Sequence, residues 1–233
     1  MQMAADGDAE ADDAVVAVAD FQSAGRGMGT NTWESEPGKN LLFSILLHPT
    51  FIPPRWQYLL SVAEALAVRS VLAEVIGDDN VTVKWPNDIY WNDMKLSGTR
   101  IDLNISSSGI RDLVIGTGIN VNQREFKSDA PNPVSLWQIT GMEHDRDAIM
   151  ECIAERFAEY YERLRMEADS EHSELMAEYH AHLYRRSGLH RFEDADGSFM
   201  AEIAGVGKDG IMTLRRGDGV LKAYEFKEVK FII

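Results

Sequence analysis

The sequence contains little cysteine, few basic residues for its length, and no long apolar run. Cys152 is the only cysteine in 233 residues, so one chain cannot form a disulfide or a cysteine-based zinc site, and a reducing cytoplasm is expected. No apolar stretch approaches the roughly 20 residues that span a bilayer. The N-terminus lacks the basic flank and apolar segment of a signal peptide. The sequence therefore predicts neither a membrane protein nor a secreted, disulfide-rich one.

The shortage of basic residues gives the chain a strong negative charge. Lys and Arg number 23 against 38 Asp and Glu, which makes the formal net charge −15. Non-specific nucleic-acid binding depends on cations that neutralise phosphates, so this balance argues against a nucleic-acid partner and against anionic membranes. What the chain does have is apolar character, 45% of its residues, which is enough for one large domain or a domain with a small appendage.

The stretch from Lys84 to Gly98 organises the sequence. Thr82 to Trp85 and Ile89 to Trp91 favour strands, and Pro86 ends the first because proline cannot donate to a ladder. A second turn at Asn92-Asp93 places a lysine at the start of the next strand. The polar side chains at these corners are Lys84, Asn87, Asp88 and Lys95. A rigid sheet can direct such residues into a cleft, although each alone also suits a solvated turn.

A second stretch, Gln22 to Gly29, is rich in glycine and carries Arg26. Three glycines in five positions allow the backbone to approach a ligand closely, and successive N–H groups in such a loop can bind an anion. A flexible surface loop is the alternative. Neither a Gly-Lys-Ser/Thr phosphate loop nor a Rossmann glycine fingerprint is present.

Periodicity predicts alternating strands and helices before residue 188. We expect a buried strand at Ala14 to Ala19 and a central strand at Asn40 to Leu47. The predicted helix from Arg55 to Ile76 has Gln57, Ser61 and Glu64 on its polar side. Further elements are strands at 99–105 and 113–122 and helices at 145–168 and 173–184, and Cys152 is interpreted as a core residue rather than a nucleophile.

The last 45 or so residues change character. Short strands are predicted at 199–206, 211–214, 220–226 and 229–232, separated by turns rich in Asp and Gly. That spacing favours a small, barrel-like β domain.

These motifs together resemble a known family. Gln22 to Gly27, Trp33, Lys84 to Asp88, Lys95 to Gly98 and Gly116 to Asn120 occur in the order and spacing of biotin–protein ligases, also called biotin–[acetyl-CoA-carboxylase] ligases. The resemblance covers about Ala14 to Ile232. It implies an α+β fold: residues 1–186 as a class II synthetase-like or biotin–lipoyl ligase-like catalytic domain with a mixed sheet and packed helices. Residues 187–233 would form a small SH3-like β-barrel C-terminal domain.

The resemblance also implies a reaction. Biotin and ATP, with Mg²⁺, would give biotinyl-5′-AMP, and biotin would then pass to a lysine of a biotin carboxyl carrier protein from acetyl-CoA carboxylase or a similar carboxylase. The chain matches the short type without an N-terminal DNA-binding domain, so repressor activity is not expected. Family members can dimerise through sheet edges, and a homodimer is left open.

The family's functional residues carry over by motif. The resemblance gives catalytic roles to Lys95 and Arg26. It implies biotin contacts for Gln22, Gly25, Arg26, Gly27, Lys95 and Gly98. It implies ATP contacts for Arg26, Trp33, Lys84, Asn87, Asp88, Lys95, Asn120 and Ser135, with Asp88 and Asn120 near the Mg²⁺ that accompanies ATP. No site built only from protein metal ligands is predicted.

Three departures from the family pattern bear on these expectations. No Ser-Thr-Asn motif precedes Ala14, from which we expect either a missing upstream segment or weak biotin binding. Met28-Gly29-Thr30 stands where a second arginine is usual, and Arg100 stands where an aliphatic residue is usual. Two alternatives follow: a lipoate ligase or octanoyltransferase of the same fold, or a non-catalytic ligase domain. Octanoyltransferases use a site cysteine, and Cys152 lies on the wrong element for that role.

Overall fold

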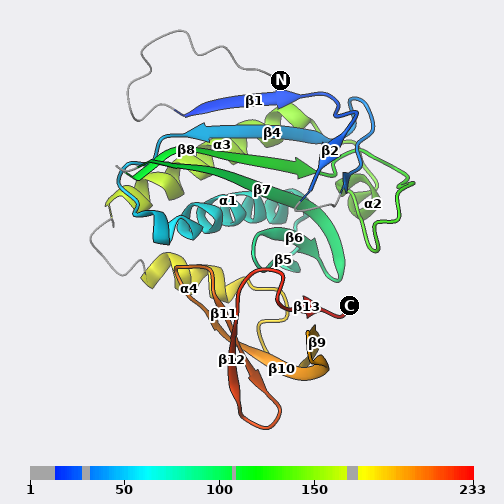
Figure 1. Ribbon diagram of the computed structural model, residues 1–233. Coiled ribbons are helices and arrows are strands. Elements are labelled where there is room, and N and C mark those ends of the chain that lie inside the picture. The colour runs from blue at the N-terminus through cyan, green and yellow to red at the C-terminus, as the bar shows by residue number, and fades with distance from the viewer. Residues whose placement is uncertain (1–13, 28–31, 107–108, 167–172) are drawn as a thin grey trace.

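The computed structural model describes residues 14–27, 32–106, 109–166 and 173–233, and its main feature is a six-stranded sheet (Figure 1). The strands run in the order β1-β4-β8-β7-β6-β5. Their bounds are β1 Val15–Ala19, β4 Leu41–Leu47, β5 Val81–Lys84, β6 Asp88–Trp91, β7 Met94–Ser106 and β8 Gly109–Ile119. All five pairings are antiparallel, whereas a mixed sheet was expected. Hairpins join β5 to β8 in sequence, and this connection makes neighbours antiparallel.

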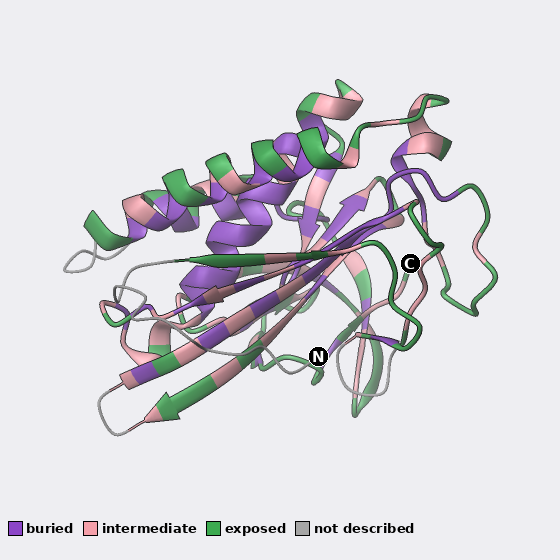
Figure 2. Ribbon diagram, turned by 90° about the horizontal axis from the view of Figure 1, so that it is seen from above, coloured by how far each residue is buried: buried purple, intermediate pink, exposed green. Residues whose placement is uncertain are grey.

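The helices lie on one side of this sheet (Figure 2). Residues of β4, β7 and β8 line a cleft. The helical elements are a 3₁₀ turn at Pro54–Trp56, α1 Tyr58–Ile76, α2 Leu136–Thr140, α3 Arg146–Met166 and α4 Ser173–Ala181. Helix α1 is the central one, and it ends at Gly77, whose φ of 70° is left-handed. A short further pair, β2 Gly25–Arg26 and β3 Thr32–Trp33, comes from the glycine-rich stretch. None of the described helices is both long and apolar enough to cross a bilayer.

The prediction that helix α1 has a solvent-facing polar side is wrong. Ser61 is 3% exposed and Glu64 is fully buried, although the pattern placed both on a solvent-facing side. The helix packs between the sheet, α3 and α4, so it is buried around most of its circumference. Its polar residues therefore point at other polar residues inside the molecule.

Two further predictions of burial are also wrong. Among the described residues, β1 is an edge strand of the sheet and pairs with β4 alone, and Val16 and Val18 are 42% and 52% exposed. Cys152 is exposed on α3. The buried side of that helix includes Ile149 and Ile153. Cys152 immediately precedes Ile153, so its side chain is turned by about 100° around the helix axis from that of Ile153.

The C-terminal part forms a second sheet below the first (Figure 1). Its strands, in the order β12-β11-β10-β9-β13, are β9 His190–Asp194, β10 Gly197–Val206, β11 Met212–Arg216, β12 Leu221–Tyr224 and β13 Lys230–Phe231. Trp85 Nε1 donates to Gly210 O at 3.0 Å, and this bond ties the turn after β5 to the β10–β11 hairpin. The predicted α+β class, with a small C-terminal β domain, is confirmed.

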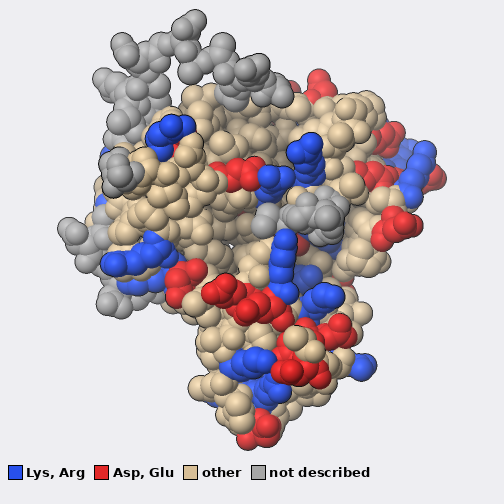
Figure 3. Space-filling model, viewed as in Figure 1, with Lys and Arg blue, Asp and Glu red and all other residues tan. Residues whose placement is uncertain are grey.

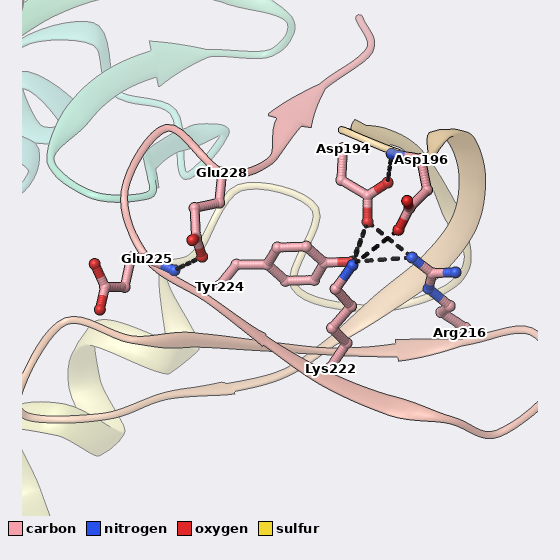
Figure 4. A network of polar contacts seen from close by, with 7 residues as sticks. All are labelled: Asp194, Asp196, Arg216, Lys222, Tyr224, Glu225 and Glu228. Atoms are coloured by element: carbon pink, nitrogen blue, oxygen red, sulfur yellow. Dashed lines mark hydrogen bonds and ion pairs between the residues drawn. The ribbon is translucent and has the colours of Figure 1, made fainter.

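Asp194 is the centre of a polar network in the second sheet (Figure 4). Its side chain is 3% exposed, and its Oδ2 accepts hydrogen bonds from Arg216 Nη2 at 2.8 Å, Lys222 Nζ at 2.9 Å and Tyr224 OH at 2.8 Å. The hydrogen bond from Lys222 is the largest cause that lowers the pKa of Asp194, to about 2. The network links β9, β11 and β12, so it holds the three strands together.

We predict that Asp194→Asn weakens the acid sensitivity of the fold. A carboxylate with a depressed folded pKa stabilises the protein above its unfolded pKa of about 4, and that stability is lost as the pH falls toward about 2. The variant should have a lower unfolding temperature near neutral pH and a shallower decline between about pH 4 and about pH 2. Thermal unfolding followed by circular dichroism measures both. Asp218→Asn, at an exposed turn position, is the control, and equal acid slopes in all three proteins would contradict the prediction.

Candidate functional site

A cleft of about 1950 Å³ lies between the open face of the large sheet and the second sheet. Strands β4, β7 and β8 form its floor, the glycine-rich stretch and the loop at 126–133 form its sides, and residues 226–231 close its lower edge. On the face shown in Figure 3, basic and acidic side chains are interspersed rather than gathered into one basic surface.

Lys95 and Asp88 form the charged pair at the mouth of the cleft. Lys95 Nζ lies 2.7 Å from Asp88 Oδ2, with both side chains about one-third exposed or less. The backbone of Lys95 is fixed on the opposite side, where its N–H donates to Asn132 O at 2.7 Å and its carbonyl accepts from Val134 N at 2.9 Å. The predicted order of strand, turn, strand, turn and strand is observed here, and it places an ammonium group firmly at the start of β7.

Lys84 and Asn87 flank this pair. Lys84 Nζ donates to Tyr90 OH at 3.1 Å and lies 5.4 Å from the ring centroid of Phe231. Burial lowers the pKa of Lys84, and the charge of Asp88 opposes that shift. Asn87 donates from Nδ2 to Ser61 Oγ at 2.9 Å, so helix α1 holds the turn from below. Both residues line the cleft.

Beside Lys95, glycine backbone forms the cleft floor, and the indole ring of Trp33 lies on it. A Cβ on Gly98 would stand 3.0 Å from both Lys95 Nζ and Trp33 Cζ3, and a Cβ on Gly118 would stand 2.5 Å from Trp33 Cε2. Only glycine leaves room for the ring and the ammonium at these positions. Trp33 Nε1 is buried and has no acceptor among the described residues, so a ligand with an acceptor atom here would satisfy it.

In the glycine-rich stretch, one residue packs within the β2–β3 pair and others line the cleft. Gly25 pairs with Trp33, and a Cβ on it would stand 2.5 Å from Trp33 O, so it packs the β2–β3 pair and does not line the cleft. Gln22, Arg26 and Gly27 do line it. The predicted effect of Met28-Gly29-Thr30 concerns positions that lie outside the described residues.

Asn120 and Ser135 serve the loop that follows β8. Asn120 lines the cleft, but its Nδ2 already donates to Val134 O at 3.1 Å. Ser135 is fully buried and caps helix α2, because its Oγ accepts from Gln138 N at 3.1 Å and Gln138 Oε1 accepts from its N–H. Ser135 therefore does not reach the cleft, and the capping box that it begins was missed in the sequence.

Glu64 is the functional-site neighbour that the sequence pattern missed. Thr117 Oγ1 donates to Glu64 Oε1 at 2.6 Å, and Thr99 Oγ1 donates to Oε2 at 3.2 Å. The two threonines face each other on β7 and β8, directly beside Gly98 and Gly118. Burial raises the pKa of Glu64 to about 7, and the hydroxyl hydrogen bonds oppose the shift. The sequence signal for this contact was a threonine that follows or precedes a glycine in each of two paired strands.

We predict that Glu64→Gln removes a decline of stability with rising pH. The folded pKa lies above the unfolded value of 4.5, so the folded state binds more protons between about 4.5 and about 7, and stability falls as the pH rises across that window. Glutamine is neutral at every pH, so the variant should show a flatter profile in chemical denaturation. Glu74→Gln, exposed on the same helix, should keep the wild-type profile. A slope in Glu64→Gln that matches wild type would contradict the assignment.

Comparison with known proteins agrees with this geometry. A model of the biotin/lipoate A/B protein ligase family matches residues 4–120, about half of the chain. The bifunctional ligase/repressor BirA of Bacillus subtilis is 30% identical over 92% of this chain, and the chain spans only 65% of that protein's length. The biotin–[acetyl-CoA-carboxylase] ligase of Mycobacterium tuberculosis is 27% identical over 84% of this chain and 70% of its own.

A solved structure gives the same relationship in three dimensions. The biotin protein ligase from Aquifex aeolicus in complex with biotin and ATP superposes with a TM-score of 0.77 and 26% identity, covering 93% of this chain and 89% of that chain. Two sheets, a glycine-lined floor and a lysine at the start of β7 thus accompany a sequence match that extends over half of the chain. This chain belongs to the biotin/lipoate A/B protein ligase family.

Proposed function

We propose that this chain is an ATP-dependent biotin–protein ligase. The family match supports this proposal, and so does the similarity to an Aquifex structure that contains biotin and ATP. The observation that carries it is the Lys95 ammonium, 2.7 Å from Asp88 and next to the bare backbone of Gly98, at the mouth of a cleft. A carboxylic acid lying on that floor would place its carboxylate against this cation.

The first step joins two anions, which explains why cations line the cleft. A carboxylate oxygen of biotin attacks the α-phosphorus of ATP, the acyl–phosphate bond of biotinyl-5′-AMP forms, and the bond to pyrophosphate breaks. Lys95 would neutralise the charge that gathers between the carboxylate and the α-phosphate, and Arg26 would hold the adenylate from above. Holding the two reactants together removes a bimolecular penalty of roughly 7–11 kcal/mol in well-oriented cases.

In the second step the neutral amine of a carrier lysine attacks the acyl carbon, an amide bond forms, and AMP leaves. We propose that the acceptor is a biotin carboxyl carrier protein of acetyl-CoA carboxylase or a similar carboxylase, as the name of the Mycobacterium relative suggests. No cluster of three or more metal-binding side chains occurs among the described residues. Mg²⁺ would accordingly be bound mainly through phosphate oxygens, with Asp88 as the candidate protein ligand.

One assay tests the proposal against its alternatives. Purified protein receives ATP, Mg²⁺, a biotin carrier domain, and either biotin or lipoate, and both pyrophosphate release and carrier labelling are measured. Biotin-dependent release and labelling support the proposal. Lipoate-dependent transfer would instead identify a lipoate ligase, which the same family model includes, and the absence of both would identify a non-catalytic domain.

Three further predictions stay proposals. We place the domain boundary between residues 186 and 187, next to Gly188 and ahead of β9. A homodimer through the exposed edge strand β1 is open to a test by sedimentation. A cytoplasmic location is the third.

A further inference from the structure

A second charged pair lies on the cleft floor, farther along β7 than Lys95. Arg100 donates from Nε and Nη2 to Asp102 Oδ1 at 3.1 and 2.8 Å. Both residues line the cleft, and with Gly98 they occupy alternate positions of β7, so the three share one face of the strand. The catalytic assignments above do not use this pair.

The cleft floor beside Arg100 has room for a small group. Arg100 pairs in register with Gly116 on β8, and Gly116 pairs with Ser44 on β4. A Cβ on Gly116 would meet nothing closer than Ser44 Oγ at 3.6 Å and Arg100 O at 3.8 Å. Unlike the floor at Gly118, this part is not filled by the Trp33 ring. The nearest atoms are the Ser44 hydroxyl and the backbone carbonyl of Arg100.

The Arg100–Asp102 pair keeps hydrogen-bonding capacity for a ligand. Both bonds from the guanidinium go to the same oxygen, so no donor reaches Asp102 Oδ2 among the described residues, and at least three of the five guanidinium N–H donors are left. The Arg100 and Asp102 side chains are 37% and 60% exposed. Donors and an acceptor thus stand side by side on the floor, and this arrangement matches a group that carries a carbonyl next to an N–H.

The position of the pair fits the far end of a bound acid. Lys95 Nζ lies against Gly98, and Arg100 begins two residues farther on the same face, roughly 7 Å along the strand. An acid with its carboxylate at Lys95 would run past the Trp33 ring that lies on Gly98 and Gly118, and it would present its other end to Arg100. A hydrocarbon or dithiolane end would remove water from the ion pair and give nothing in return.

We propose that Arg100, supported by Asp102, is a specificity-determining residue that recognises a cyclic urea or amide at the far end of the acid substrate. The inference rests on the proposed function, because it takes the acid to lie between Lys95 and this pair. It selects biotin, whose ring is a cyclic urea, over lipoate and over simple fatty acids.

The test compares Arg100→Leu with Arg111→Leu. Arg111 forms a similar ion pair with Asp112 at 2.8 Å on the neighbouring strand but does not line the cleft. In acid-dependent ATP–pyrophosphate exchange, Arg100→Leu should raise the KM for biotin about 10- to 100-fold, the range for a lost hydrogen bond to a charged group. Its kcat should stay within about 2-fold, and its KM for octanoate should stay level or fall. Arg111→Leu should match wild type for both acids.

Several outcomes would overturn the assignment. A biotin KM unchanged in Arg100→Leu, or an equal rise for biotin and octanoate, would each do so. Arg100→Lys keeps the charge without the planar fork and should give an intermediate KM, and it serves as the second variant if the leucine variant unfolds. If wild type shows no exchange with any acid, the proposed function fails. Calorimetric binding of biotin to wild type and Arg100→Leu then decides this assignment separately: a loss in the variant supports it, and equal binding or none overturns it.

Discussion

Replacing Lys95 with alanine is expected to lower the rate of biotin-dependent pyrophosphate release by about 10²- to 10³-fold, the usual cost of removing one group that stabilises developing charge. The ammonium that lies 2.7 Å from Asp88 belongs to a residue whose backbone pairs with β6 on one side and is hydrogen-bonded to Asn132 and Val134 on the other. Its loss leaves the carboxylate and the α-phosphate facing each other without neutralisation. Single-turnover measurement of pyrophosphate release at saturating biotin and ATP gives this rate directly.

The matched control is Lys39→Ala. Lys39 also pairs with a carboxylate, Glu143 at 3.5 Å, but on the surface away from the cleft. It should keep wild-type turnover, and both variants should keep the wild-type circular dichroism spectrum, because the Lys95 side chain is 31% exposed and outside the core. Near-normal turnover in Lys95→Ala would remove this residue from the mechanism.

The second large effect is expected from Gly118→Ala. One added methyl group would stand 2.5 Å from Trp33 Cε2, a separation that real Cβ contacts do not adopt, so the indole has to move off the floor. Overpacking of this kind costs about 1–3 kcal/mol, and displacement of the ring should raise the KM for both the acid and ATP by about tenfold or more. Steady-state exchange assays with each substrate varied in turn measure the two constants.

Gly205→Ala is the comparison for this prediction. Gly205 also lies in an antiparallel pair, on β10, but no atom lies within 4 Å of a Cβ built there. That variant should match wild type in both constants. If Gly118→Ala also matched wild type, the stacking of Trp33 on the floor would not be a feature of the working enzyme.

The corners of the site were predictable because local chemistry determines them. Pro86 ends β5, Asn92 takes a positive φ of 52° in the next turn, and the strand that follows begins with Lys95 in its second position. Each of these features depends on residues within a few positions of one another. Turn chemistry of this kind acts locally, so one sequence is enough to place the two lysines and Asp88.

What the sequence did not reveal depends on partners far along the chain. Glu64 has a polar pattern on a helix, and that pattern alone cannot distinguish a solvated side from a side facing Thr99 and Thr117. The valines of β1 form a short apolar run that is typical of a buried strand, yet its position at the sheet edge depends on which strands pair. Ser135 was assigned an ATP contact from the family resemblance, and its capping of a helix of only five residues became visible in the structure.

The position of Arg100 also depends on tertiary pairing, which the sequence does not reveal. The sequence shows an unusual residue, but only the register with Gly116 and Ser44 places it on the cleft floor. Strand register is set by tertiary pairing, and a slip of one residue would turn the side chain to the opposite face. The interpretation of Arg100 therefore had to wait for the fold.

The most direct test of the central claim follows the oxygen atoms of the acid. Biotin labelled with ¹⁸O in its carboxylate is incubated with the protein, ATP, Mg²⁺ and a carrier domain, and the AMP produced is analysed by mass spectrometry. If the carboxylate attacks the α-phosphorus in the cleft beside Lys95, each AMP released on transfer carries one labelled oxygen. Unlabelled AMP, or the formation of ADP in its place, would contradict the account.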